Sequence, residues 1–197
     1  MDDRQHKYFW RMEQHQKQLQ AMWQDKCVQL YNDFESPDDL DEVSSVFLAG
    51  PTSRNQILEC NWRCEAVRLL REAGFTGWIF CPEPRGQELP GDFTERSLIH
   101  RWESDRLMCA THVAFWIPRK ADELLGLNTN LELGVFVGLA ISNNLDGQQL
   151  FVGWPPRAER MGLPEHYLNM AGMDHYTELK ELCEAISVTP RQRPKSI

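Results

Sequence analysis

No apolar run in this sequence approaches the roughly 18 residues that a membrane-spanning helix needs. The first residues, 1–6, have neither the basic segment nor the apolar stretch of a signal peptide. Lysine and arginine form no dense patch, and the net charge at pH 7 is −8. Nucleic acid polymers and anionic membranes are therefore poor partners for this chain. We expect a cytoplasmic protein whose ligands are small molecules.

The six cysteines include no Cys-x-x-Cys pair. Most of them lie inside apolar patterns, which is typical of buried, reduced thiols in a cytoplasmic protein. Cys60 and Cys64 are four residues apart and would suit half of a metal site, but no second pair accompanies them. The sequence therefore predicts neither a metal site nor a cofactor.

Residues 1–35 contain neither glycine nor proline and are rich in polar side chains. Their apolar residues recur at steps of three and four: Met12, Leu19, Trp23, Cys27, Leu30 and Phe34. This spacing predicts an amphipathic helix that packs on the main body or on another subunit. An acidic linker follows, so that residues 1–43 form an N-terminal helical extension.

Strand-like and helix-like segments alternate from residue 44 onward. Short apolar runs predict strands over 45–50, 78–81, 112–117 and 149–153. Amphipathic or capped segments predict helices over 53–74, 92–108, 131–141 and 176–186. Strands separated by helices of this length form a parallel sheet. We expect one doubly wound, flavodoxin-like α/β domain over 44–188, with four or five parallel strands and a mobile tail over 189–197.

Ligands of such a domain bind beyond the carboxyl ends of the strands. The first predicted strand is followed by a turn of small residues that leads into a helix: Gly50, Pro51, Thr52, Ser53 and Arg54. Backbone amides and hydroxyls in such a turn suit an anion or a sugar hydroxyl. The turn is neither a P-loop nor a Gly-x-Gly-x-x-Gly loop, which disfavours nucleoside triphosphates and dinucleotides. Alternatively, Ser53 only caps the helix.

Carboxylates gather at the same predicted edge. Asp92 follows the second strand, Glu103 precedes the third beside Trp102, and Glu132 follows the third. Two or more carboxylates around one pocket suit glycosyl transfer, since one attacks the anomeric carbon while others orient hydroxyls or protonate the leaving group. Further candidates for substrate contact follow the third strand, namely Trp116, Arg119, Asn128 and Asn130.

Glu132 stands near the start of a predicted apolar helix, where the helix dipole favours the ionised form. An ionised glutamate there can act as a nucleophile or a general base. The alternative is a capping box, because Thr129 and Glu132 have the Thr-x-x-Glu spacing in which the glutamate only bonds a backbone amide.

The sequence over about 44–170 resembles the nucleoside 2-deoxyribosyltransferase-like family. The resemblance rests on the order and spacing of eight short stretches: Val46–Arg54, Trp62–Ala66, Gly74–Gly77, Phe80–Arg85, Asp92–Phe93, Trp102–Glu103, Phe115–Arg119 and Thr129–Gly134. It implies that Glu132 attacks the anomeric carbon, expels the base and forms a covalent deoxyribosyl-enzyme. A second base or water then takes the sugar, and Glu103 binds sugar hydroxyls. It also implies a homo-oligomer whose neighbouring subunit completes the pocket.

The chain departs from that family in several places, including Ala110-Thr111, where many relatives have Ala-Asp. Glu103 stands where better-known bacterial members have an aspartate, and Val46 stands where they have a tyrosine that orients the nucleophile. Asn128 and Asn130 occupy the region of an aspartate linked to proton transfer at the base.

Three functions follow from these observations. The first is retaining cleavage or transfer of the N-glycosidic bond of 2′-deoxynucleosides, with a nucleoside and a free base as partners. Its close variant acts on nucleoside 5′-monophosphates, with Ser53, Arg54 or Arg119 binding the phosphate. The third, from a different class, is a catalytically inactive regulatory protein that binds nucleosides or nucleotides, which the missing tyrosine and aspartate favour.

Overall fold

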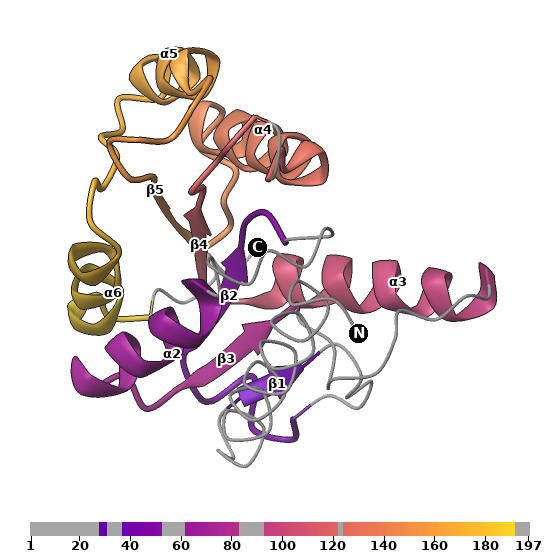
Figure 1. The fold of residues 1–197 in the computed structure, drawn as a ribbon. Helices are drawn as coiled ribbons and strands as arrows, with labels where there is room; N and C mark the ends of the chain where they lie inside the picture. Colours follow the sequence, from indigo (N-terminus) through magenta and orange to yellow (C-terminus); the bar gives the residue numbers. More distant parts are fainter. Residues whose placement is uncertain (1–27, 31–36, 53–61, 83–92, 122–123, 192–197) are drawn as a thin grey trace, which may run out of the picture.

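The computed structural model describes residues 28–30, 37–52, 62–82, 93–121 and 124–191. Its centre is a five-stranded sheet with the order β1-β3-β2-β4-β5 (Figure 1). All neighbouring strands are parallel. The strands are β1 (Val28–Leu30), β2 (Ser45–Ala49), β3 (Trp78–Cys81), β4 (His112–Trp116) and β5 (Gln149–Gly153). The predicted parallel sheet is confirmed, and the fold is α/β, consistent with a flavodoxin-like class.

The described helices are α2 (Trp62–Glu72), α3 (Phe93–Cys109), α4 (Leu127–Ile141), α5 (Gly162–Met170) and α6 (Leu179–Val188). Helix α5 was not predicted, because only Leu168 of its residues is buried and the chain there shows no inward-facing apolar stripe. Pro164 lies in its first turn, where proline is tolerated. In the described part of the chain, no helix is long and apolar enough to cross a membrane.

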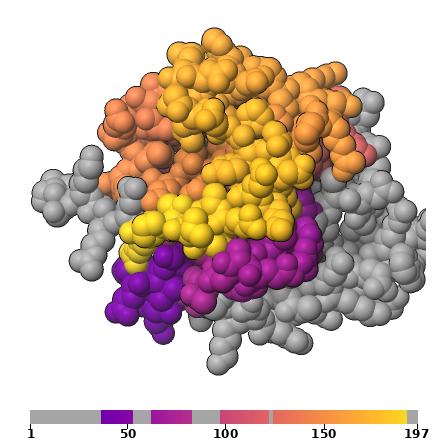
Figure 2. Space-filling view, turned by 90° about the vertical axis from the view of Figure 1, so that its left-hand side faces the viewer, coloured from indigo at the N-terminus to yellow at the C-terminus, as the bar shows by residue number. Residues whose placement is uncertain are grey.

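The two faces of the sheet are covered by different helices. Val46 and Leu48 of β2 belong to a buried cluster with α2 and α6, while Phe47 and Ala49 belong to a second cluster with α3, α4 and α5. This division follows from the alternation of side chains along a strand. Helices α2 and α6 pack against each other, and the space-filling view shows α6 lying along α2 on one face of the molecule (Figure 2).

The helix predicted for the N-terminal extension is wrong over Val28–Leu30. These residues form β1, which pairs in parallel with β3. The backbone of β1 forms its hydrogen bonds with β3, a strand that is distant in sequence. Three residues are too few to show the alternation that predicts a strand. The remainder of the predicted helix, 1–27 and 31–36, lies outside the described residues.

The first three residues of the tail that is predicted to be mobile, 189–191, contact other parts of the chain. The Thr189 carbonyl lies 3.1 Å from Nε2 of His112, and the Pro190 carbonyl accepts a hydrogen bond from Gln149 Nε2 at 3.0 Å. Arg191 donates to the Asp41 carbonyl. The mobility of the tail stays a prediction, and 192–197 lies outside the described residues.

Candidate active site

The strand order reverses between β2 and β4, and α/β proteins form their ligand-binding crevice at the carboxyl ends of two such strands. From β2 the chain crosses to β3 on one side, whereas from β4 it crosses to β5 on the other. Connections that diverge from two neighbouring strands leave an open space between them, where ligands of α/β proteins bind. The residues that follow these two strands, and the helices that begin nearby, define the candidate site.

Gly50 closes the base of this crevice. A Cβ atom at Gly50 would overlap the backbone carbonyl oxygen of Trp116 and lie 2.6 Å from Cζ2 of Trp62. Only glycine allows the turn after β2 to approach β4 so closely. Pro51 then contacts the start of α4, since a Cβ at Gly126 would lie 3.0 Å from the Pro51 Cβ. The turn therefore joins β2, β4 and α4 at one point.

Arg63 places a buried positive charge at the end of β2. Its side chain is 2% exposed, and its guanidinium lies 4.6 Å from the centre of the Trp62 ring. Nε donates to the Leu48 carbonyl at 3.0 Å, and a terminal nitrogen donates to the Gly50 carbonyl at 2.6 Å. The other terminal nitrogen donates to Oγ1 of Thr52 at 3.0 Å. These acceptors hold the guanidinium rigidly at the carboxyl edge of the sheet.

Glu132 is the titratable group most strongly affected by this environment. Burial and the negative charge of Glu103 raise its pKa to about 7, while the positive charge of Arg63 opposes the shift. The three side chains come from α4, α3 and α2, and the fold brings the two predicted catalytic carboxylates within electrostatic range of each other. A carboxylate with a strongly raised pKa in a crevice is a candidate for acid, base or nucleophile chemistry.

The predicted start of α4 is wrong by four residues, and this changes the interpretation of Glu132. The helix begins at Leu127 rather than at 131, so Glu132 lies in its second turn. The positive end of the helix dipole acts mainly within the first turn, so it is not the main influence on the ionisation of Glu132. Loss of hydration and repulsion by Glu103 outweigh that effect.

The capping-box alternative for Glu132 is also wrong. The N-cap of α4 is Gly126, in the left-handed conformation with φ 63°, and no side chain among the described residues caps the helix. Thr129 lies inside the first turn and is 3% exposed. Because a glycine backbone makes this turn, no capping side chain is required. Glu132 therefore does not cap α4, which was the structural alternative to a chemical role.

Glu103 projects from α3, with 29% of its side chain exposed and Oε2 lying 3.7 Å from Nδ1 of His100. The neighbouring Trp102 is 3% exposed and packs against Phe47 and Phe80, with ring centres 6.3 and 6.5 Å away. Trp116 is likewise buried, in the cluster on the opposite face. Both tryptophans therefore have the contacts of core residues, one on each face of the sheet.

Arg119 and Asn130 form a separate contact beside α4. Arg119 is 5% exposed, donates to Oδ1 of Asn130 and donates to the Arg160 carbonyl at 3.2 Å. Burial lowers its pKa. Asn130 and Glu132 are two residues apart on a helix and therefore point about 200° apart. The structure does not bring Arg119 and Asn130 together with the two carboxylates, and Asn128 is exposed in the first turn of α4.

Three predicted site residues, Ser53, Arg54 and Asp92, lie outside the described residues. Val46 is fully buried in the apolar cluster with α2 and α6, so the place of the family's tyrosine holds a core residue. Arg63 was not predicted as a site residue. The sequence contained one indication of its role. Arg63 precedes the apolar residues Val67 and Leu70 by four and seven positions, so its charge falls on the buried face of α2.

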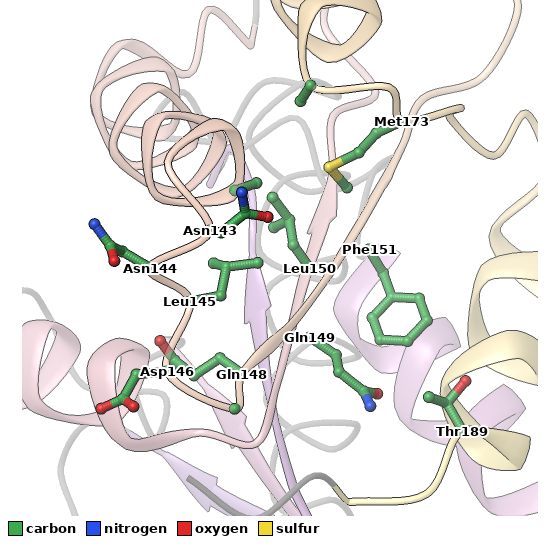
Figure 3. Close-up of a pocket in the computed structure, with 13 residues that line it drawn as sticks. Asn143, Asn144, Leu145, Asp146, Gln148, Gln149, Leu150, Phe151, Met173 and Thr189 are labelled. Carbon is green, nitrogen blue, oxygen red and sulfur yellow. The ribbon is translucent and has the colours of Figure 1, made fainter. Parts of the chain in front are cut away.

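A cavity of about 1010 Å³ lies away from this crevice, where β5 begins (Figure 3). It is lined by the turn between α4 and β5, by Ala171 and Met173 after α5, and by Thr189. Asp146 is the single charged residue among its described lining residues. The cavity offers no set of groups that could carry out a reaction, so the crevice remains the candidate site.

No protein-family profile matches this chain, and no curated protein matches it at a significant level. The geometry of the crevice and the spacing of the sequence motifs are therefore the features that indicate a function.

Proposed function

We propose that this protein breaks the N-glycosidic bond of 2′-deoxynucleosides with retention of configuration. The observation that carries the proposal is that Glu132 lies within electrostatic range of Glu103 and of the buried Arg63, which is held at the carboxyl end of the sheet. Two carboxylates at one site are the minimum that retaining glycosyl chemistry uses. The motif resemblance supplies the substrate class, a small-molecule nucleoside together with a free base.

In this mechanism the ionised Glu132 attacks the anomeric carbon from the face opposite the base. The bond between that carbon and the base nitrogen breaks, and a deoxyribosyl-glutamate ester forms. The electron pair of the broken bond stays on the base, which takes up a proton from water as it leaves. A second base completes transfer, or water completes hydrolysis, by attack on the same carbon; the ester bond breaks, the attacking group loses a proton and Glu132 is released as the carboxylate. Glu103 holds sugar hydroxyls, and its charge keeps the free energy of the ionised Glu132 high before attack.

Arg63 acts as the fixed counter-charge of the nucleophile. Its bonds to the Leu48 and Gly50 carbonyls hold it in place before substrate binds, so that no reorganisation accompanies the reaction. It favours the ionised form of Glu132, which is the form that attacks. In this proposal Arg63 replaces the orienting tyrosine that the position of Val46 no longer supplies.

We also propose a doubly wound, flavodoxin-like order of the helices, which agrees with the two buried clusters on the two faces of the sheet. A homo-oligomer is the assembly that the resemblance implies. The site is proposed to work without a cofactor or a metal, since the glutamate itself provides the nucleophile.

The direct test is incubation of the purified chain with 2′-deoxynucleosides and free bases, followed by chromatography of the bases. Release or exchange of base is expected from the wild-type protein and not from Glu132→Gln, whereas Glu165→Gln, an exposed residue of α5, serves as the matched control. A 2-fluoro-2-deoxy sugar substrate is expected to leave a covalent adduct on the peptide that contains Glu132. Turnover by Glu132→Gln at the wild-type rate would contradict the proposal.

The same assay separates the alternatives. Nucleoside 5′-monophosphates are included because Arg119 is a buried cation whose Nε has no acceptor among the described residues. Preference for the monophosphates, lost in Arg119→Met, would assign the nucleotide variant. Binding of nucleosides without turnover, unchanged in Glu132→Gln, would instead assign a regulatory binding protein.

A further inference from the structure

The outer edge of β5 carries backbone groups that do not bond to the sheet. β5 is the last strand of the sheet and pairs with β4 along its whole length. The N–H of Gln149 and the carbonyl of Gly153 point toward β4 and are hydrogen-bonded to the residues that adjoin it in the chain. Because backbone groups of successive strand residues point to opposite sides, those of Leu150 and Val152 point toward the outer edge.

A loop segment closes only the carboxyl-terminal half of this outer edge. Tyr176 pairs in parallel with Gly153. Its N–H donates to the Val152 carbonyl, and its carbonyl accepts a hydrogen bond from the N–H of Trp154, both at 2.9 Å. In the described part of the chain, no backbone group pairs with the N–H or the carbonyl of Leu150. Leu150 therefore presents one donor and one acceptor at an edge where Tyr176 already forms a strand-like pair.

The cavity at the start of β5 lies beside this free part of the edge (Figure 3). Its described lining includes Leu150 but no residue of β4, so the cavity lies on the outer side of the strand. Met173, which follows α5, lines it from one face of the sheet, and Thr189, which follows α6, lines it from the other. Its volume of about 1010 Å³ is as large as that of pockets that hold drug-sized ligands.

β5 has none of the features that usually protect a free strand edge. Its residues, Gln149–Gly153, include no charged side chain and no proline. All five pair with β4 in unbroken register, so no bulge bends the strand away. Proteins commonly place a lysine, a proline or a bulge on a free edge, because an unprotected edge pairs with other extended chains. An unprotected edge beside a cavity is therefore typical of a strand that has a pairing partner.

We propose that the outer edge of β5 binds an extended peptide segment of another protein as an added strand. The N–H and carbonyl of Leu150 pair with backbone groups of that segment, and the cavity holds its side chains. Side chains that lie beside each other on neighbouring strands share one face of the sheet. The segment's side chain next to Leu150 therefore meets Leu145 and Met173, which pack with Leu150 against the same buried cluster. An apolar residue suits that position.

Charge favours a basic segment over an acidic one. Asp146 is the single charged residue of the described lining and lies in the turn that precedes β5. A lysine or arginine at the end of the segment beside this turn gains an ion pair, and the net charge of −8 adds to the attraction. A second copy of the chain is disfavoured by the same charge. Tyr176 also leaves too short an edge for two β5 strands to pair along their length.

Fluorescence anisotropy with a labelled hexapeptide amide, Lys-Thr-Leu-Thr-Val-Thr, tests the inference on the full chain. Saturable binding is expected for the wild-type protein and, with equal affinity, for Glu132→Gln, because the edge does not involve the proposed active site. Failure of the proposed activity therefore leaves this test unaffected. An absence of saturable binding up to about 1 mM peptide would overturn the inference. A dimer of the chain that the peptide dissociates in sedimentation equilibrium would instead assign the edge to a second copy.

Backbone N-methylation of the peptide separates strand pairing from apolar contact. In an added strand, alternate N–H groups face β5 and the others face away. Methyl groups on the set that faces β5 are expected to weaken binding roughly 10-fold, since each removes a hydrogen bond and crowds the edge. Methyl groups on the other set are expected to leave the affinity unchanged. Equal affinities of the two methylated peptides would show that the segment does not bind as a strand.

Two variants of the chain test the same contacts from the other side. Leu150→Pro removes the free donor but none of the bonds to β4, and proline is tolerated where its nitrogen faces a free edge. The affinity is expected to fall roughly 10-fold.

Asp146→Asn keeps the left-handed backbone, with φ 47°, which asparagine adopts readily. It is expected to weaken binding of the lysine peptide and to reduce its salt dependence, while a peptide with threonine in place of lysine is unaffected. Glu165→Gln, an exposed carboxylate of α5, is the matched control and is expected to bind like the wild type. Unchanged affinity for the lysine peptide in Asp146→Asn and in Leu150→Pro would overturn the inference.

Discussion

Glu132 on α4 lies within electrostatic reach of Glu103 on α3, and the negative charge of Glu103 raises the pKa of Glu132. The two residues are 29 positions apart in sequence, and the sheet brings their helices together at one end. Their mutual repulsion links the ionisation of one to the ionisation of the other, so both are expected to respond to any change that alters either charge.

The first prediction concerns Glu103→Gln. Because attack requires the ionised form of Glu132, kcat/KM of the wild-type protein should rise with pH through an apparent pKa of about 7. Removal of the Glu103 charge lowers the pKa of Glu132, so the rising limb should move to lower pH. The pH–rate profile of base release measures this shift. A profile with the same midpoint in both proteins would show that the carboxylates are not coupled.

The second prediction concerns stability and does not require turnover. The pKa of Glu132 is about 7 in the folded chain and 4.5 as the ordinary value. A raised pKa means that the folded state binds the proton more tightly, so stability falls as pH rises from about 4.5 to 7 and stays low above that. Glu132→Gln removes this penalty and should stabilise the fold by up to about 3 kcal/mol at pH 8, with little effect at pH 4.

Urea unfolding at the two pH values measures that difference. Glu165→Gln, on the exposed side of α5, should change stability by less than about 0.5 kcal/mol at either pH. Equal stabilisation by Glu132→Gln at pH 4 and pH 8 would mean that packing, rather than ionisation, is responsible.

The strands could be predicted from the sequence because each is a short apolar run that ends near glycine or proline. Trp78–Cys81 and Gln149–Gly153 match the prediction exactly in their bounds, and the other two strands end one residue earlier than predicted. In contrast, β1 depends on an edge of β3 that is about 50 residues away, and no local pattern reveals such pairing. Helix α5 could not be predicted either, because its apolar side faces outward.

The site was predicted less completely than the fold, for physical reasons. The sequence identified Glu132 and Glu103, but the ionisation of Glu132 depends on burial and on neighbours from other helices. The start of α4 was predicted four residues too late because the helix begins after Gly126, whose left-handed backbone forms the N-cap. The prediction relied on a capping side chain, and Gly126 has none. Arg63 stood on the buried face of α2, and a charge at such a position indicates a specific role for that charge.

The third prediction concerns Arg63. Arg63→Met removes the counter-charge, so the pKa of Glu132 should rise above its wild-type value and the rising limb of the pH–rate profile should move to higher pH. It also leaves the Leu48 and Gly50 carbonyls without a donor, which should cost about 2 to 4 kcal/mol of stability. Arg63→Lys keeps the charge but cannot satisfy all three acceptors. It should therefore lose stability while leaving the pH–rate midpoint near that of the wild type.

The fourth prediction concerns His112 at the opposite end of the sheet. Its Nδ1 lies 2.9 Å from Oγ1 of Thr111, and its Nε2 lies 3.1 Å from the Thr189 carbonyl, so the ring joins β4 to the segment that follows α6. Burial lowers the pKa of His112 below its ordinary value of 6.5. Below pH 6.5 the unfolded chain therefore binds a proton that the folded chain resists, and stability must fall as the pH decreases through this range.

His112→Gln has no proton to gain, so the difference in unfolding free energy between pH 7.5 and pH 5 should be smaller than in the wild-type protein. His166→Gln, an exposed position on α5, should retain the wild-type dependence. An identical pH dependence in His112→Gln and wild type would show that the ring does not contribute to acid destabilisation.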